Sequence, residues 1–397
     1  MKKKEKMRIR EEDQKEIDIL SKLPIDISFD ILSRFPLNSI LQWKRVSKTW
    51  YNLIKHPRFA ILHYTRIPSP SYVFVFDCFG YLHLITYKFS SNNPFEVPLT
   101  TIITYKLEFK EFDQVFGSMR VNRCKVVGSV NGLICIDRGF NLYNPCPYYI
   151  CNPITQDHIT LPNSHNIWIG KFSSGFGFDS ISNEYKVVRI SVLEFSKSRA
   201  EVYTFGLGNW REIKADLLSS ITSMEQSNVF LNGAIYWLAF INDFTPAIVS
   251  FNVATEEFDI IKLSSDIQKI YKGGWELAVL KDYLYLIDGN PYSRFHKLWV
   301  MKDHGVQPVQ DSWIQDCSIR SQKSICLEIG RNEMMNVEKS ELVLLNSKII
   351  GYYNHQNKTV RLVVMDKSRS SIMVGVGSLI SPKDLCDSVK RVSNSAN

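Results

Sequence analysis

The sequence predicts a small all-α N-terminal unit followed by an all-β domain, a β-propeller of about six to eight blades. Three observations predict this. Apolar residues recur at helical spacing between Leu23 and Phe59, short apolar runs separated by turn residues begin at Ser71, and a turn–strand phrase recurs within that second region. With 397 residues, 45% of them hydrophobic, the chain is long enough to bury a core in both units.

We expect five segments along the chain. They are a charged flexible tail (1–20), the helical domain (21–64), a linker (65–70), the β-propeller (71–380) and a C-terminal tail (381–397). Two prolines, Pro68 and Pro70, would stiffen the linker.

Three short amphipathic helices are expected in the N-terminal unit. Pro24 suits the start of the first helix, because its missing N–H would have no partner there. The apolar face of that helix, which would end at Pro36, carries Ile27, Ile31, Leu32 and Phe35. Asn38 or Ser39 can cap the second helix, and Ser47 can cap the third. A helical unit of about 40 residues buries too little surface to be stable alone, so its apolar faces need another surface.

This helical unit resembles the F-box family. The matching phrases are Leu23-Pro24-x-Asp26-Ile27, Ile31-Leu32-Ser33-Arg34-Phe35-Pro36, Arg45-Val46-Ser47-Lys48-x-Trp50 and His56-Pro57-x-Phe59. In that family the motif docks on a Skp-type adaptor and so joins a cullin-RING ubiquitin ligase. The resemblance implies a buried adaptor contact made by Leu23, Pro24, Ile27, Leu32, Pro36, Leu41, Val46 and Trp50, with Lys48 at its polar edge.

Two positions depart from the family pattern. Phe35 stands where the family usually has Leu, and Trp43 stands where it usually has a smaller apolar residue. Both are apolar, so they bear on the affinity for the adaptor more than on binding itself. The alternative interpretation of these helices is an ordinary N-terminal cap on a larger fold.

The region after Ser71 is rich in β-branched and aromatic runs that predict strands, for example at 71–76, 186–190 and 247–251. A turn followed by an apolar strand begins at Asn131, at Asn232 and at Lys281, with offsets of 101 and 49 residues. A unit near fifty residues matches the period of Kelch-like propeller blades. The phrase Asn-x-x-Thr, at Asn152 and Asn252, predicts hairpin turns between outer strands.

A late strand at 372–376 is left over after the other blades are assigned. We expect it to pair with the first blade and close the ring, because closure removes open sheet edges. A pair of packed sheets, as in a β-sandwich, is the alternative.

The β region also resembles the F-box-associated interaction domain that is abundant in plants. The matching phrases are Asn152-Pro153-x-Thr155, Gly175-Phe176-Gly177-Phe178-Asp179 through Tyr185-Lys186-Val187-Val188, Leu298-Trp299-Val300-Met301-Lys302 and Ser312-Trp313-Ile314. In that family the domain recognises the protein that is destined for ubiquitination. The resemblance therefore implies a protein substrate, whose binding residues the sequence does not identify.

The composition gives no reason to expect a cofactor or a metal site. Eight cysteines are too few for a disulfide scaffold, and the spacing of Cys146 and Cys151 is wrong for a zinc knuckle. The net charge of +8 arises partly from the N-terminal tail, where acidic residues interleave with basic ones, so we expect no nucleic-acid partner. The lack of a secretory signal and of a spanning apolar run predicts no membrane association and a cytoplasmic or nuclear location.

No sequence motif indicates catalysis. The run Gly175-Phe176-Gly177-Phe178 resembles a phosphate loop only superficially, because its phenylalanines alternate as in a strand. We expect these glycines to allow close packing between blades. The acidic pair Glu256-Glu257 is expected to be solvated, and no HExxH or GxSxG motif occurs. We therefore expect no catalytic residue.

These expectations combine into one functional prediction: the substrate-recognition subunit of a Skp-cullin-F-box ubiquitin ligase, which acts by proximity and performs no bond chemistry itself. Three alternatives stay open. They are a non-proteolytic, adaptor-bound scaffold or regulator, a pollen self-incompatibility F-box protein that recognises pistil ribonucleases, and an enzyme of sugar or small-molecule chemistry built on the propeller.

Overall fold

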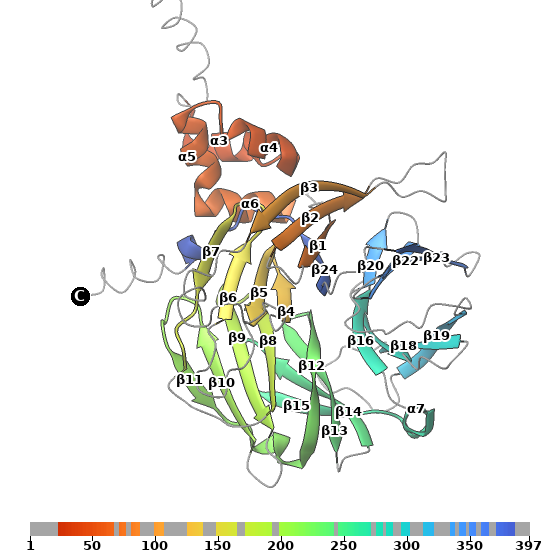
Figure 1. Ribbon diagram of the computed structural model, residues 1–397. Helices are drawn as coiled ribbons and strands as arrows, with labels where there is room; N and C mark the ends of the chain where they lie inside the picture. Colours follow the sequence, from red (N-terminus) through yellow and green to blue (C-terminus); the bar gives the residue numbers. More distant parts are fainter. Residues whose placement is uncertain are drawn as a thin grey trace, which may run out of the picture.

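The computed structural model describes the helical unit and most of the β domain (Figure 1). The described residues are 23–66, 71–76, 81–87, 99–106, 125–137, 148–164, 171–192, 198–241, 245–270, 275–280, 283–288, 295–301, 313–320, 334–337, 341–346, 349–354, 359–364 and 371–385. The expected charged tail (1–20) lies outside them, as do 67–70 of the expected linker.

Four helices form the N-terminal unit: α3 (Ile25–Leu32), α4 (Leu37–Trp43), α5 (Lys48–Lys55) and α6 (Pro57–Arg66). Pro24 precedes the first turn of α3, as expected. The Ser47 hydroxyl accepts a hydrogen bond from the Trp50 N–H (3.2 Å), which confirms its role as the cap of α5. The expected cap of α4 is wrong: Pro36, in an extended conformation, stands at the N-cap, so Asn38 and Ser39 fall inside the first turn.

The last helix, α6, was not expected as a separate helix, and it is tied to α3 at its far end. Arg66 Nη1 donates to Asp30 Oδ1 (2.5 Å) and to Ser33 Oγ (2.9 Å). Thr65 and Arg66, which the sequence places in the linker, are therefore the last residues of α6.

The β domain has a propeller-like arrangement of four-stranded antiparallel sheets (Figure 1). The first two sheets are β24 (Ser371–Val376), β1 (Ser71–Phe76), β2 (Tyr81–Tyr87) and β3 (Leu99–Lys106), then β4 (Lys125–Val130), β5 (Leu133–Asp137), β6 (Tyr148–Asn152) and β7 (Asp157–Thr160). The next two are β8 (Lys171–Asp179), β9 (Glu184–Val192), β10 (Arg199–Thr204) and β11 (Trp210–Ile213), then β12 (Ile221–Leu231), β13 (Ala234–Ile241), β14 (Thr245–Asn252) and β15 (Phe258–Lys262). The last two are β16 (Trp275–Leu280), β17 (Tyr283–Asp288), β18 (Phe295–Met301) and β19 (Trp313–Arg320), then β20 (Met334–Val337), β21 (Glu341–Asn346), β22 (Ile349–Asn354) and β23 (Thr359–Val364). The short helices η1 (Asp216–Ser220) and α7 (Ser265–Ile270) lie between strands.

The late strand pairs with the first sheet, as expected. β24 is antiparallel to β1, in a register that runs from Ser71 opposite Val376 to Phe76 opposite Ser371. Strands from the two ends of the β domain therefore complete one sheet. This arrangement of many sheets differs from the two packed sheets of the β-sandwich alternative.

The recurring phrases form the turns that the sequence predicts. Asn131 and Gly132 join β4 to β5, and Asn232 and Gly233 join β12 to β13, with φ between 49° and 79° at these four residues. Such positive φ values are what a two-residue hairpin turn requires. The turn of the third phrase, at 281–282, lies outside the described residues.

The two Asn-x-x-Thr phrases form matching turns between outer strands, which also confirms the prediction. Asn152 Oδ1 accepts the N–H groups of Ile154 (2.8 Å) and Thr155 (3.3 Å) in the β6–β7 turn. Asn252 Oδ1 accepts those of Ala254 (2.9 Å) and Thr255 (3.1 Å) in the β14–β15 turn. An Asn side chain that bonds to the backbone two residues later is a standard way to fix a turn.

The glycines of β8 allow close packing between neighbouring sheets, as expected. A Cβ at Gly175 would lie 2.6 Å from the Trp237 ring, and one at Gly177 would lie 2.6 Å from Val253. Trp237 is fully buried, and its Nε1 donates to the Ser174 carbonyl (3.2 Å). The β8 strand and the β12–β15 sheet therefore approach more closely than any residue with a Cβ would allow.

Candidate functional site

Helix α3 and the turn after it carry an exposed apolar row on one side of the helical unit. Phe35, 40% exposed, lies in that turn, because α3 ends at Leu32, and on the helix itself Ile27 (48% exposed) and Ile31 (39%) are spaced at i and i+4. Residues at this spacing share one face. The opposite side of α3 holds Phe29 and Leu32 in the core of the unit. We call Ile27, Ile31 and Phe35 the α3 row.

Aromatic contacts link the end of the α3 row to α4 and α5. The rings of Phe35 and Trp43 meet edge to face with centroids 4.7 Å apart, and Trp43 meets Trp50 edge to face at 5.4 Å. In the part of the chain that the structure describes, Trp50 Nε1 has no hydrogen-bond acceptor. Val46, 48% exposed, lies between Trp43 and Trp50 in the sequence.

The residues predicted to bind an adaptor fall into three groups. Those exposed are Pro24, Ile27, Pro36, Val46 and Lys48. Those half-buried are Leu23, Leu41 and Trp50. Leu32 is 1% exposed, so it supports the surface from beneath and does not lie on it.

Ile31 and Phe35 are exposed beside these residues, although the prediction does not include them among the adaptor contacts. The sequence places both on the apolar face of the first helix, but apolar spacing alone does not tell which of Ile31 and Leu32 faces outward. The expectation that this helix ends at Pro36 is wrong, because α3 ends at Leu32 and Phe35 lies in the turn that follows.

A buried histidine holds the backbone beneath the α3 row. His63 of α6 is 1% exposed, and its Nε2–H donates to the Phe35 carbonyl (2.9 Å). Burial lowers the pKa of His63, and the hydrogen bond to Phe35 opposes that effect only in part. Burial thus favours the neutral imidazole, whose Nε2–H bond ties the Phe35 carbonyl to α6.

An acidic residue on α3 forms ion pairs beside this surface. Asp30 Oδ2 accepts from Arg34 (2.8 Å), and Asp30 Oδ1 accepts from Arg66. The hydrogen bond from Arg66, and after it that from Arg34, lowers the pKa of Asp30. The margin of the helical unit is thus charged, whereas the α3 row is apolar.

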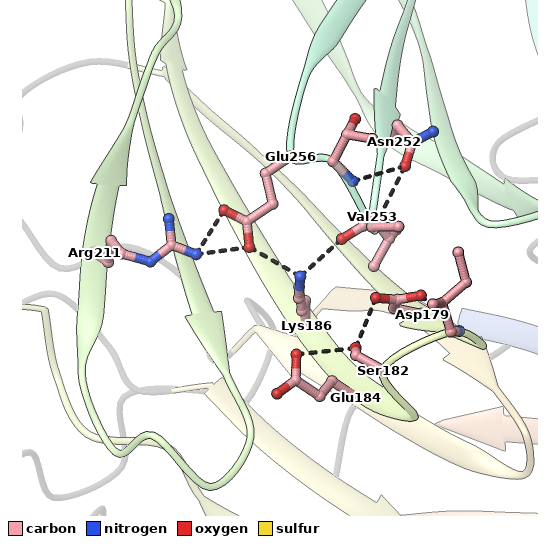
Figure 2. A network of polar contacts seen from close by, with 11 residues as sticks. Asp179, Ser182, Glu184, Lys186, Arg211, Asn252, Val253 and Glu256 are labelled. Atoms are coloured by element: carbon pink, nitrogen blue, oxygen red, sulfur yellow. Dashed lines mark hydrogen bonds and ion pairs between the residues drawn. The ribbon is translucent and has the colours of Figure 1, made fainter.

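In the β domain, a second polar network lies between two sheets (Figure 2). Glu256 accepts from Arg211 at both carboxylate oxygens (2.6 Å each) and from Lys186 (2.9 Å), which also donates to the Val253 carbonyl (2.9 Å). Burial raises the pKa of Glu256, but the bonds and charges of Arg211 and Lys186 outweigh burial and hold it below its ordinary value.

The prediction that Glu256 is solvated is therefore wrong. Its side chain is 14% exposed, and from the β14–β15 turn it reaches Lys186 and Arg211 of the neighbouring sheet. A carboxylate that is engaged by two cations joins two sheets and is not positioned as a general base. Close by, Asp179 accepts from the Ser182 hydroxyl (2.6 Å) and from the Ile181 N–H (2.8 Å), and so fixes the β8–β9 turn (Figure 2).

The described residues offer no group of three His, Cys, Asp or Glu side chains that could hold a metal ion. Cys135 and Cys151 are buried free thiols, and burial raises the pKa of Cys151 to about 12. Cys146, the other member of the spaced pair, lies outside the described residues. Within the same residues, no helix is both long enough and apolar enough to cross a bilayer.

The comparisons with known proteins match both units. The model of the F-box domain family matches residues 20–62, and that of the F-box associated beta propeller domain family matches residues 84–394. Among curated proteins, three F-box proteins of Arabidopsis thaliana are similar to the chain. One is 30% identical over 64% of this chain and 61% of its own length, a second is 27% identical over 76% and 78%, and the F-box protein DOR is 27% identical over 74% and 73%.

The first of these relatives is thus matched over less than two thirds of its own length. Among solved structures, a prolyl endopeptidase aligns at 10% identity and a TM-score of 0.38 over 82% of this chain and 50% of that chain, which is too remote to carry an argument. The two family matches together span the helical unit and nearly all of the β domain. The chain belongs to the family of F-box proteins that carry an F-box-associated β-propeller domain.

Proposed function

We propose that the chain is the substrate-recognition subunit of a Skp-cullin-F-box ubiquitin ligase. The helical unit binds a Skp-type adaptor through the α3 row and its neighbours, and the β domain binds a target protein. The chain itself performs no bond chemistry, since its part is to hold the target where the effective concentration of acceptor lysines is high. Such a role is carried out in the cytoplasm or the nucleus.

The α3 row is the observation that carries this proposal. A unit of four short helices has room for only a small core, yet three large apolar side chains of the row are left 39–48% exposed. Exposed apolar side chains that lie together, rimmed by charge, are typical of protein contact sites. Asp30, Arg34 and Lys48 supply the charged rim.

For the β domain, we propose that each four-stranded sheet is one blade, which gives a ring of six. The support is the grouping of β1 to β24 into six sheets of four, together with the pairing of β24 with β1. The Kelch-like subtype stays a prediction from the fifty-residue period. Turns at the rim of such a ring are the natural place for a protein target, because they are exposed and vary freely in sequence.

Co-purification tests the adaptor contact. The full chain and its variants are mixed with a Skp-type adaptor and a cullin and are then separated by size. The double variant Ile27→Asp/Ile31→Asp places two charges in the α3 row without touching the core. Ile61→Asp is the matched control, because Ile61 is similarly exposed (38%) but lies on α6, outside the row.

The wild-type chain and Ile61→Asp should co-elute with the adaptor, and the double variant should not. Circular dichroism should show the same helix content in all three proteins. The proposal is wrong if the wild-type chain fails to bind, or if the double variant binds as tightly as the control.

A further inference from the structure

The chain turns back after β24 and enters the core of the protein. Ser378, Leu379, Ile380 and Ser381 are at most 6% exposed, and residues 382–385 form one helical turn in which Leu385 is half-buried. We call residues 377–385 the C-terminal segment. The expected C-terminal tail, from 381 on, therefore starts with residues that pack against the rest of the protein.

Asn152 binds this segment to the β6–β7 turn. It is fully buried, and its Nδ2 donates to the carbonyls of Ile380 (2.7 Å) and Ser378 (3.0 Å), with a longer contact to Ser378 Oγ (3.3 Å). Its Oδ1 meanwhile accepts the N–H groups of the turn. Asn152 thus satisfies two buried carbonyls that have no strand partner, which makes it costly to replace.

The C-terminal segment lies in the core that the helical unit shares with the β domain. One continuous apolar core contains Ile40 and Phe59 of the helices, Ile154 of the β6–β7 turn, and Leu379 and Ile380 of the segment. Leu385 packs against the same core. In Figure 1 the helical unit sits at the end of the β4–β7 sheet, beside β6 and β7.

Charge gathers at the same junction. Asp157, at the start of β7, lies 3.8 Å from Lys383 of the C-terminal segment. Burial lowers the pKa of Lys44, at the end of α4, and the negative charge of Asp157 opposes that shift. One carboxylate therefore interacts with a cation from the helical unit and with another from the C-terminal segment.

Asn252 provides an internal comparison. It fixes the β14–β15 turn with the same pair of hydrogen bonds, but its side chain is exposed, and among the described residues it bonds only within its own turn. The contact with a distant segment is thus particular to Asn152 and is not a property of the Asn-x-x-Thr turn.

We propose that Asn152 is a positioning residue: by holding the C-terminal segment in the shared core, it fixes the angle between the F-box and the β domain. As this rests on the proposed function, the angle would decide where a bound target stands relative to the ubiquitin-carrying enzyme. A fixed angle keeps the effective concentration of acceptor lysines high, whereas a loose junction spreads them over a larger volume.

A distance measurement on the full chain tests this proposal without any ligase component. Fluorophores are attached to p-acetylphenylalanine at two exposed positions, Asn52 on α5 and Asn209 in the β10–β11 turn, and single-molecule energy transfer gives the distance distribution. Asn152→Asp keeps the acceptor oxygen for the turn but cannot donate to Ser378 and Ile380. Asn252→Asp makes the same change in the turn that has no distant contact.

The wild-type chain and Asn252→Asp should give the same single narrow distribution, and Asn152→Asp should give a broadened or shifted one. Leu385→Ala removes an apolar contact of the C-terminal segment without altering any hydrogen bond of Asn152, and it should also broaden the distance distribution. If Asn152→Asp does not fold, the result for Leu385→Ala tests the proposal. An unchanged distribution in both variants would overturn the proposal. Failure of the wild-type chain to bind an adaptor is a separate result: it would contradict the proposed function but would not change the measured distance distribution.

Discussion

Phe35 and Trp43 contact each other edge to face, with ring centroids 4.7 Å apart. These are the two positions at which the chain departs from the usual F-box pattern. The larger residue at each position is accommodated by the other, and Trp43 extends the contact to Trp50. The two departures thus form one aromatic substitution and not two independent ones.

The first prediction is that Phe35 and Trp43 are energetically coupled. An aromatic pair in this geometry contributes about 0.5–1.5 kcal/mol beyond its buried area. Phe35→Leu should therefore cost roughly 1 kcal/mol in the wild-type chain and less in a Trp43→Ala background. A double-mutant cycle by urea unfolding, followed by circular dichroism, measures the coupling, and strictly additive effects would refute it.

The second prediction concerns pH and His63. The pKa of His63 in the folded chain is lowered below the ordinary value of 6.5. As the pH falls through 6.5, His63 therefore becomes protonated in the unfolded chain but not yet in the folded chain. The contribution of His63 to the free energy of unfolding is fully present above pH 6.5 and is lost as the pH falls toward the folded pKa. His63→Gln can still donate to Phe35 but does not titrate. The loss of stability between about pH 7.5 and 5.5 should be smaller in His63→Gln than in the wild-type chain when unfolding midpoints are compared.

The third prediction concerns packing at β8. Gly175→Ala places a methyl group 2.6 Å from the Trp237 ring and 2.9 Å from Ile235, so the sheets must move apart at a cost of about 1–3 kcal/mol. Gly128→Ala is the control, because the nearest atom to its new Cβ would lie at 3.5 Å, an ordinary contact. In thermal unfolding, the midpoint should fall clearly for Gly175→Ala and stay near the wild-type value for Gly128→Ala. Equal midpoints would show that the β8 glycines are not needed for packing.

The fourth prediction concerns Glu256. Glu256→Gln leaves the ammonium of Lys186, only 6% exposed, without its carboxylate, and removing one partner of a buried pair costs about 3 kcal/mol or more. Arg211→Gln removes a cation that is 48% exposed and should cost less than about 1 kcal/mol. Urea unfolding of the two variants should rank them in that order, and the reverse order would contradict the network as described.

Local features of this fold could be predicted from the sequence, because their causes lie within a few residues. The cap at Ser47 and the turns at Asn152 and Asn252 depend on bonds to backbone groups two or three residues away. The pairing of β24 with β1 was also predictable, because a leftover strand and the open edge of a sheet each have backbone N–H and C=O groups without partners.

The rest depends on contacts that leave no local signature. The choice between Ile31 and Leu32 as the outward residue is made by the packing of α3 against α5 and α6. Pro36, and not Asn38 or Ser39, stands at the N-cap of α4, because a proline can begin a helix without any side-chain bond. The bond from Asn152 to Ile380 joins residues 228 positions apart, and nothing in the phrase Asn152-Pro153-x-Thr155 distinguishes it from the turn at Asn252.

The pairing of β24 with β1 also sets an order of events during synthesis. The residues of the F-box are made long before β24, and the first sheet lacks its fourth strand until residue 376 has been made. The C-terminal segment that enters the shared core follows later still. A nascent or prematurely ended chain therefore presents the exposed apolar residues of the α3 row while the edge of β1 stays open, and that edge is paired only after β24 has been made.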